Sequence, residues 1–376
     1  MSQINTNAIV DASGGTTATV NGYTPTASNM AGRNRIINGD MRIDQRNEGA
    51  SVSAVDSGFP IDRWKFAANP SAKFNGQRNA GAITPPVGFT NYLGATSTSS
   101  YSVASGDYQG FQHRIEGFNV ADLAWGTANA APITISFWVR SSLTGTFGGS
   151  LYNNAANRSY PFTFTISAAN TWEQKTFTVQ GDTSGTWTTD NSAGLTITFG
   201  LGVGTTYSGT AGAWAGTLYF SATGATSVVG TSGATFYITG VQLEAGSVAT
   251  PFEHRQYGQE LALCQRYYYV HNHIGSSGTR TMPLSVLYAT TGWEGTWAGV
   301  RTPVPMRSSP TVFTSLAYII HTGDIYSTLS YSSFGARHLG GGIYSCGGYG
   351  GIGTAGTKGM MMCEAQNATT SFQAEL

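Results

Sequence analysis

The chain has 376 residues, and only 10% of them are charged, against about a quarter in ordinary soluble domains. Its 19 acidic and 19 basic residues give a formal net charge of zero, which argues against nucleic acid as a partner, because a binding face needs a basic surplus. No apolar run is long enough to span a bilayer and no signal-peptide core opens the chain, so we expect synthesis in a cytoplasm without secretion or membrane insertion.

The rest of the composition points to short strands joined by tight turns. Glycine accounts for 50 residues and aromatic residues for 12%, which is too high for a disordered chain. The low charge suits a protein whose surface is largely buried in an assembly. Cys264, Cys346 and Cys363 have no paired spacing, so we expect reduced thiols rather than a disulfide frame or a metal site. We expect no cofactor.

Residues 1–36 differ in composition from the rest of the chain. They are small and polar with isolated apolar residues, and they cannot build a core of their own. Two interpretations remain open: a disordered tail, or an arm that becomes ordered against a partner. The isolated Ile and Val side chains favour the arm.

The next region alternates as β-strands do. ITISFWVR (133–140) places Ile133 and Phe137 on one face and Trp138 on the other, and LTITFGLGV (195–203) repeats the pattern. EQKTFTVQG (173–181) and TLYFSATG (217–224) are weaker copies. Turn signals separate these runs, at Gly148-Gly149, Gly181-Asp182 and Ser184-Gly185. Strands at this spacing, with little helical periodicity, predict an antiparallel sandwich.

The sandwich is predicted to end near residue 254. ATFYITGVQLEAG (234–246) alternates with a phase slip at Gly240, which predicts a β-bulge there. After Pro251, apolar residues recur at helical spacing through residues 256–269, at Tyr257, Leu261, Cys264 and Tyr268. We therefore divide the chain into an arm (1–36), a sandwich (37–254), a linker helix (255–270) and a C-terminal β domain (271–376).

The C-terminal domain is predicted from strand-like runs at 285–290 and 311–320 and from the terminal SFQAEL. GGGIYSCGGYGGIG (340–353) is predicted to be a glycine-rich loop that carries Tyr344 and Tyr349. Such a loop suits a distal tip that binds a ligand, or alternatively a simple connector.

Several stretches in the same order resemble a family of tailed-bacteriophage fibre and spike proteins. They cover roughly residues 34–376: NRIINGDMRIDQRN (34–47), PIDRW (60–64), FQHRIEGFNVADLAWG (111–126), ITISFWVR, GDTSGTW (181–187), ITGVQLEAGSVATPFEHRQYGQELALCQRYYY (238–269), VPMRSSPTV (304–312) and the final AEL. The resemblance implies a jelly-roll sandwich similar to carbohydrate-binding modules. It also implies a homotrimeric virion appendage whose N-terminal arm docks on tail or adaptor proteins of the particle.

The same resemblance places Glu253, His254 and Arg255 at the family's junction between sandwich and helix. An Arg–Glu pair there could hold the linker to a neighbouring chain, and a solvated turn is the alternative. If the chain is a trimer, the helix around Leu261, Cys264 and Tyr268 is expected to pack near the threefold axis.

Aromatic residues are the main candidates for glycan binding, because their rings stack on pyranose rings. We select Trp125, Trp138, Trp187, Tyr344 and Tyr349, while most aromatic residues in a sandwich are core. The wider set contains Trp64, Tyr92, Tyr101, Tyr108, Trp172 and Trp214.

Catalysis and metal binding have weaker support. Asp107, Glu116, Asp122, Asp182 and Asp190 are the candidate carboxylates for a glycosidase, but no spacing makes a pair of them converge. The sequence contains no GxSxG elbow, P-loop or HExxH helix. We therefore predict no catalytic residue. His271 and His273 share one face of a strand and could give six imidazoles around a threefold axis, but two surface histidines are the better interpretation, so no metal is predicted.

These observations predict a virion structural protein of a phage tail, a fibre or tailspike subunit that binds host surface polysaccharide. The alternatives are a depolymerase that cleaves that polysaccharide, and a purely structural head or tail fibre or decoration subunit.

Overall fold

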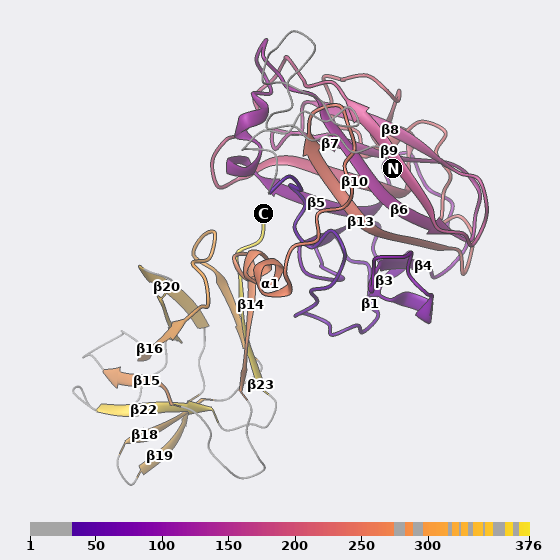
Figure 1. Cartoon of the computed structure of the whole chain (residues 1–376). Helices are drawn as coiled ribbons and strands as arrows, with labels where there is room; N and C mark the ends of the chain where they lie inside the picture. The colour runs from indigo at the N-terminus through magenta and orange to yellow at the C-terminus, as the bar shows by residue number, and fades with distance from the viewer. Residues whose placement is uncertain are drawn as a thin grey trace, which may run out of the picture. The chain divides into compact units, whose positions relative to one another are not determined.

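The structure is a computed structural model that describes residues 32–273, 283–288, 296–314, 318–322, 325–329, 334–340, 343–348, 358–363 and 368–376. Side chains are described at 32–270, 302–311 and 371–376. The chain divides into two compact units, Met1–Arg255 and Gln256–Leu376. In Figure 1 the first unit runs from indigo to orange and the second from orange to yellow.

Two antiparallel sheets form the first unit. The six-stranded sheet has the order β1 (Val52–Ser53), β3 (Phe74–Arg78), β4 (Leu93–Ser97), β13 (Thr235–Ala245), β6 (Ile133–Ser141) and β9 (Glu173–Val179). The five-stranded sheet has the order β2 (Trp64–Asn69), β5 (Tyr108–Glu116), β10 (Ala193–Val203), β7 (Gly145–Tyr152) and β8 (Ser159–Ile166). The chain passes repeatedly from one sheet to the other, as it does in a jelly roll, so the predicted all-β sandwich is confirmed.

Alternating apolar side chains of both sheets meet in one core. Phe137 of β6 packs edge-to-face on Phe199 of β10, with ring centroids 5.1 Å apart. Phe147 of β7 and Phe236 of β13 lie 5.9 Å apart across the same layer. Each of these rings is fully buried, as the period-two alternation of β6 and β10 predicts.

The predicted bulge in β13 is present. The register of β13 against β6 shifts between Thr239 and Gln242, and Gly240 has a φ of +60°, which favours glycine. The bulge lets Ile238 and Leu243 both face the core, although strict alternation would put residues five positions apart on opposite faces.

The predicted turn at Gly148-Gly149 is wrong, because both glycines lie inside β7. A Cβ on Gly149 would come within 2.2 Å of the Thr198 carbonyl oxygen and 2.4 Å of the Phe162 ring. Glycine is present here because the strand approaches its neighbours so closely that no side chain fits. TLYFSATG is likewise mostly irregular: only Ser221–Ala222 forms a short strand, β12, parallel to β11 (Ser208–Gly209).

Short 3-10 helices occupy the connections of the first unit. They are η1 (Ala80–Ala82), η2 (Gly117–Asn119), η3 (Ala121–Leu123) and η4 (Thr205–Tyr207). Of these, η2 and η3 follow β5 directly and position the loop that carries Trp125.

The segment 32–36, which the sequence assigned to the arm, is bound to β13. The Arg35 amide donates to the Leu243 carbonyl at 2.9 Å, and Ile36 is fully buried. Glu253 accepts hydrogen bonds from the amides of Gly32 and Asn34, both at 2.7 Å. The rest of the predicted arm lies outside the described residues.

Arg255 completes the attachment of this segment. Its guanidinium donates to the carbonyls of Ile36, at 3.0 Å, and Asn34. The sequence alternatives for Glu253 and Arg255 were a solvated turn and a contact to another chain. In the structure both side chains instead bind the start of their own sandwich, and we name them the Glu253–Arg255 clamp.

The second unit contains one helix and three antiparallel sheets among its described residues. The helix is α1 (Tyr257–Gln265). The first sheet has the order β14 (Tyr268–His273), β23 (Ala368–Gln373) and β17 (Thr311–Thr314). The second has the order β15 (Pro283–Tyr288), β22 (Lys358–Cys363), β18 (Tyr318–Thr322) and β19 (Ile325–Leu329). The third has the order β16 (Thr296–Arg301), β21 (Ile343–Gly348) and β20 (Phe334–Gly340).

Two predictions in the second unit require correction. The helix ends at Gln265 rather than continuing to Tyr268, because Tyr268 pairs with Gln373 as the first residue of β14, and a run of tyrosines favours a strand. The predicted glycine-rich loop contains β21, the central strand of its sheet, so Tyr344 has Val300 and His338 as register partners. Among the residues that the structure describes, no helix has the length and apolar character needed to cross a membrane.

Candidate functional site

Loops from three different connections meet at one end of the sandwich. The end of β5 pairs with the start of β10 (Glu116 with Ala193), and the start of β6 pairs with the end of β9 (Ile133 with Val179). The β5–β6 and β9–β10 connections therefore lie at the same end. They carry Trp125 and Trp187, and the connection between β11 and β12 adds Trp214.

The three indoles form one cluster. Trp125 lies 4.7 Å from Trp187 and 5.3 Å from Trp214, measured between ring centroids, and all three pairs are edge-to-face. Each indole N–H donates to a backbone carbonyl, on Ala131, Ser184 and Gln180 respectively. These bonds fix the ring planes, as is usual for tryptophans that are partly withdrawn from water.

The loops around the cluster are tied together by polar contacts. The Arg158 guanidinium donates two hydrogen bonds of 2.7 Å to the Asp182 carboxylate, and this pairing raises the pKa of Arg158. The Gly126 amide donates to the Asp182 carbonyl at 2.7 Å, which joins the β5–β6 loop to the β9–β10 loop. Gly126 has a φ of +84°, and a Cβ there would meet the Gly185 carbonyl oxygen at 2.6 Å.

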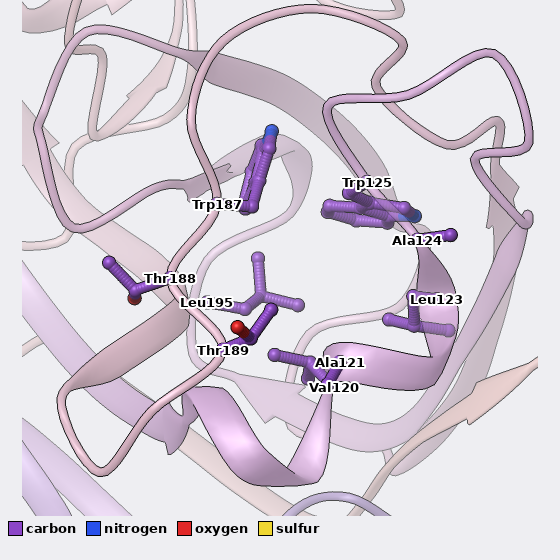
Figure 2. A pocket seen from close by; sticks show the side chains of 9 residues that line it. All are labelled: Val120, Ala121, Leu123, Ala124, Trp125, Trp187, Thr188, Thr189 and Leu195. Atoms are coloured by element: carbon purple, nitrogen blue, oxygen red, sulfur yellow. The ribbon is translucent and has the colours of Figure 1, made fainter.

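A small hollow opens beside Trp125 and Trp187. It has a volume of about 30 Å³ and is lined by Val120, Ala121, Leu123, Ala124, Trp125, Trp187, Thr188, Thr189 and Leu195. Figure 2 shows the two indoles on one side of it and Val120 with Ala121 on the opposite side. The structure thus brings together two sequence-selected residues, but at 8% and 9% exposure neither ring is an open stacking surface.

Trp138 has a different environment. It lies on the outward face of β6, half-buried, between its cross-strand partners Thr239 of β13 and Gln174 of β9. Its Nε1 has no hydrogen-bond partner within the described part of the chain and is not buried, so the N–H reaches solvent. Every other tryptophan whose side chain the structure describes donates to a backbone carbonyl; these are Trp64, Trp125, Trp172, Trp187 and Trp214.

Further hydrogen-bonding side chains lie on the same outward face as Trp138. Gln174 and Thr176 are exposed on the outward face of β9, and no described residue bonds their side chains. Arg140 donates through Nε to the Asn170 carbonyl at 2.9 Å and lies over the Tyr237 ring, but no carboxylate pairs with it within residues 32–270. We name Trp138, Arg140, Gln174 and Thr176 the Trp138 strip.

Aromatic packing supports one end of this strip. Tyr237, in register with Arg140, is buried against Tyr92, and Trp172 packs on both rings at 5.6 and 6.4 Å. Burial raises the pKa of Tyr92, whose hydroxyl donates to the Ala80 carbonyl at 2.6 Å. The strip therefore rests on a rigid sheet rather than on loops. Sequence analysis identified Trp138 but missed Gln174, Thr176 and Arg140, since only the strand register makes them its neighbours.

The candidate carboxylates occupy separate structural positions. Asp107 accepts from the Tyr101 hydroxyl at 2.6 Å, Asp122 pairs with Arg35, and Asp182 pairs with Arg158. Asp190 accepts from Ser192, which lowers the pKa of Asp190, and Glu116 is buried. Within the described residues no group of three or more His, Cys, Asp or Glu side chains could hold a metal ion.

The remaining predicted positions belong to the second unit. Cys264 is fully buried, Leu261 is half-buried in α1, and Tyr268 is buried on β14. His271 and His273 lie on β14 and Tyr344 lies on β21, where side chains are outside the described set, and Tyr349 lies outside the described residues altogether. Their roles stay predictions.

Comparison with known proteins gives no family. No protein-family model and no curated protein sequence matches the chain. Among solved structures, the enzymatically active domain of tailspike protein 4 from bacteriophage CBA120 is similar over 52% of this chain and only 21% of its own length, with 10% identity and a TM-score of 0.28.

Two further solved structures are similar at the same level. A putative sugar binding protein from Bacteroides thetaiotaomicron matches 57% of this chain and 100% of its own, with 12% identity and a TM-score of 0.33. A family 11 carbohydrate-binding module from Clostridium thermocellum matches 54% and 98%, with 12% identity and a TM-score of 0.27.

Proposed function

We propose that this chain is a subunit of a bacteriophage tail fibre or tailspike whose sandwich binds a glycan on the host cell surface. The observation that carries glycan binding is the Trp138 strip: a half-exposed indole whose N–H bonds to no described residue, beside three side chains that offer further donors. Sugars present an apolar ring face and a rim of hydroxyl groups, so an aromatic surface bordered by donors and acceptors matches both.

The strip also suits ligand binding because it lies on paired strands of a sheet rather than on a loop. Its side chains project from paired strands, so their relative positions are fixed before a ligand arrives and little ordering entropy is lost on binding. Arg140, which has no carboxylate partner within residues 32–270, adds a preference for acidic sugars, because a guanidinium forms paired hydrogen bonds to carboxylates.

The virion role rests on the motif resemblance and on the low charge of the chain. We propose a homotrimer, attached to tail or adaptor proteins through residues 1–31, after synthesis in the bacterial cytoplasm. Of the three helix-region candidates, only Leu261 is partly exposed and able to contact another subunit, because Cys264 and Tyr268 are buried within their own chain. Linked sites of a trimer hold a cell firmly even when each site is weak, because linkage raises the effective concentration. Mass measurement in solution tests the trimer, and loss of virion incorporation after deletion of residues 1–31 tests the arm.

Glycan binding is tested with the full chain and purified host polysaccharide. We expect Trp138→Ala to weaken binding at least about 30-fold, since a central aromatic anchor is worth about 2 kcal/mol or more. Trp138→Phe, which keeps a ring but no N–H, should give a smaller loss. Tyr257→Ala, which removes an aromatic side chain that is 58% exposed in the second unit, is the matched control and should bind normally.

Two results would overturn the proposal: no binding of wild type to any surface polysaccharide of the host, or Trp138→Ala binding as well as wild type. Cleavage is followed in the same samples. We expect no released oligosaccharide, because the candidate carboxylates have separate structural partners. Release that is lost on substitution of one of them would make the chain a depolymerase.

A further inference from the structure

The hollow beside Trp125 and Trp187 is distinct from the Trp138 strip and has its own chemistry. We infer that it receives a methyl substituent of a bound sugar, either the acetamido methyl of an N-acetylated sugar or the C6 methyl of a 6-deoxy sugar. This inference rests on the proposed function in that it takes the ligand to be a glycan.

Size is the first argument. A volume of about 30 Å³ corresponds to roughly two water molecules, since one molecule needs about 10–15 Å³ by this measure. A pyranose ring is far too large to enter, whereas one methyl group fits. The hollow can therefore take a substituent of a sugar but not the sugar itself.

The floor of the hollow is apolar. Val120, Leu123 and Leu195 are buried members of the sandwich core, and the two indoles beside them have their N–H groups turned to backbone carbonyls. A bound water needs two to four polar partners, and these five side chains supply none. A methyl group needs no hydrogen-bond partner, and its removal from water lowers the free energy. It is therefore favoured in the hollow over a hydroxyl group or a water molecule.

The exposed edge of the hollow, its mouth, combines a free hydroxyl group with small side chains. Thr189 is exposed, and its hydroxyl has no partner among the described residues, whereas the Thr188 hydroxyl donates to the Ala193 carbonyl at 2.6 Å. Ala121 and Ala124 leave the mouth open because their side chains are small. A sugar ring held at the mouth would find a hydroxyl donor directly beside its substituent.

An exposed aromatic residue shortly precedes the lining residues Val120 and Ala121 in the chain. Phe118 is 60% exposed, two residues before Val120, and its amide donates to the Asp190 carbonyl at 2.9 Å. This bond holds it against the segment that supplies Thr188 and Thr189. In this inference the Phe118 ring stacks on the sugar while the methyl substituent enters the hollow.

The experiment uses the full chain labelled with 5-fluorotryptophan, so that each of the eight tryptophans gives a fluorine resonance, assigned by single Trp→Phe replacements. N-acetylglucosamine is compared with glucose, and L-rhamnose with L-mannose; each pair tests one source of the methyl group. We expect one methyl-bearing sugar to shift the Trp125 and Trp187 resonances and to bind about three- to fivefold more tightly than its partner, the effect of one buried methyl group.

Two variants make the test specific. Ala121→Leu places a larger side chain in the hollow and should abolish the preference for the methyl-bearing sugar. Asn119→Leu adds the same side chain at an exposed position outside the lining and should retain it. In Trp138→Ala the shifts at Trp125 and Trp187 should persist, because the two sites are separate.

The outcomes separate this inference from the proposed function. If sugars perturb Trp138 while no methyl-bearing sugar shifts Trp125 or Trp187, the inference is wrong and glycan binding at the strip stands. Retention of the preference in Ala121→Leu also overturns the inference. If no sugar perturbs any tryptophan, the inference is wrong, and binding of the host polysaccharide decides the proposed function separately.

Discussion

Removing Glu253 should release the start of the sandwich without unfolding the rest. In Glu253→Ala, the amides of Gly32 and Asn34 lose their acceptors, each at 2.7 Å in the structure. A hydrogen bond to a charged group contributes about 1.5–3 kcal/mol, and the Gly32 bond is exposed, so we take about 2 kcal/mol for the pair. That value corresponds to an opening equilibrium about 30-fold more favourable for residues 32–34.

The loss should remain local because other contacts hold the following residues. The Asn34 side chain donates to the Val241 carbonyl and accepts from the Ile36 and Leu243 amides, while Arg255 continues to bind the Asn34 and Ile36 carbonyls. Segments with separate hydrogen-bonded anchors open separately.

Amide hydrogen exchange measures this directly. Exchange at Gly32 and Asn34 should accelerate about 30-fold in Glu253→Ala, and exchange in β10 should not change. Glu173→Ala is the matched control, since the Glu173 carboxylate also holds two backbone amides, on Ser167 and Ala168, at 2.8 and 2.9 Å. It should accelerate exchange at those two positions only. Unchanged exchange at Asn34 in Glu253→Ala would refute the clamp.

Two further predictions concern the core. Burial, with the nearby Arg63 as a second cause, holds the pKa of His113 well below its usual value. Below about pH 6.5 the unfolded chain therefore takes up a proton at this histidine that the folded chain does not. The free energy of unfolding should fall by up to about 1.4 kcal/mol per pH unit as the pH drops from about 6.5 to about 5. In His113→Gln the free energy of urea unfolding, followed by hydrogen exchange of β5, should depend less on pH. An equal pH dependence in wild type and variant would show that His113 is not the group responsible. Gly149→Ala should destabilise the sandwich by at least about 3 kcal/mol, because its Cβ would meet the Thr198 carbonyl oxygen at 2.2 Å. Gly106→Ala is the control and should change the melting temperature little, because nothing lies within 4 Å of a Cβ there. Similar melting temperatures for the two variants would show that β7 is less tightly packed than the structure indicates.

Strands with one buried and one polar face were predictable from the sequence, and strands built on glycine were not. Apolar residues alternate through the sequences of β6 and β10, although β10 is buried on both faces and its register against β5 shifts twice. Even the bulge in β13 was visible as a phase slip at Gly240. β7 has the sequence GTFGGSLY, in which glycines replace the alternating side chains, so the pattern indicates a turn. Whether a glycine marks a turn or a close approach depends on what lies across the sheet, and the sequence does not contain that information.

The clamp illustrates a second limit. Glu253 and Arg255 were recognisable as an unusual polar cluster after a strand, but their partners lie more than 200 residues earlier in the chain. A carboxylate and a guanidinium bind any exposed backbone amide or carbonyl, so their chemistry does not select a partner. Only the pairing of residues 34–36 with β13 brings the two segments together.

The two kinds of tryptophan site differ for a reason that lies in the backbone. In a sheet, carbonyls point within the plane of the sheet and bond to the neighbouring strands, so an indole on the face of a strand finds no backbone acceptor in its own sheet. Trp64 of β2 donates to a carbonyl only because another segment, at Asn38, covers it. In a loop, carbonyls are not used by pairing, and Trp125, Trp187 and Trp214 each bond to one. The Trp138 N–H bonds to no described residue because this side chain stands on the outward face of β6, a position that the alternation of ITISFWVR predicts. An outward tryptophan in the middle of an alternating strand is therefore a stronger indication of a ligand surface than a tryptophan in a loop, where the backbone satisfies the indole.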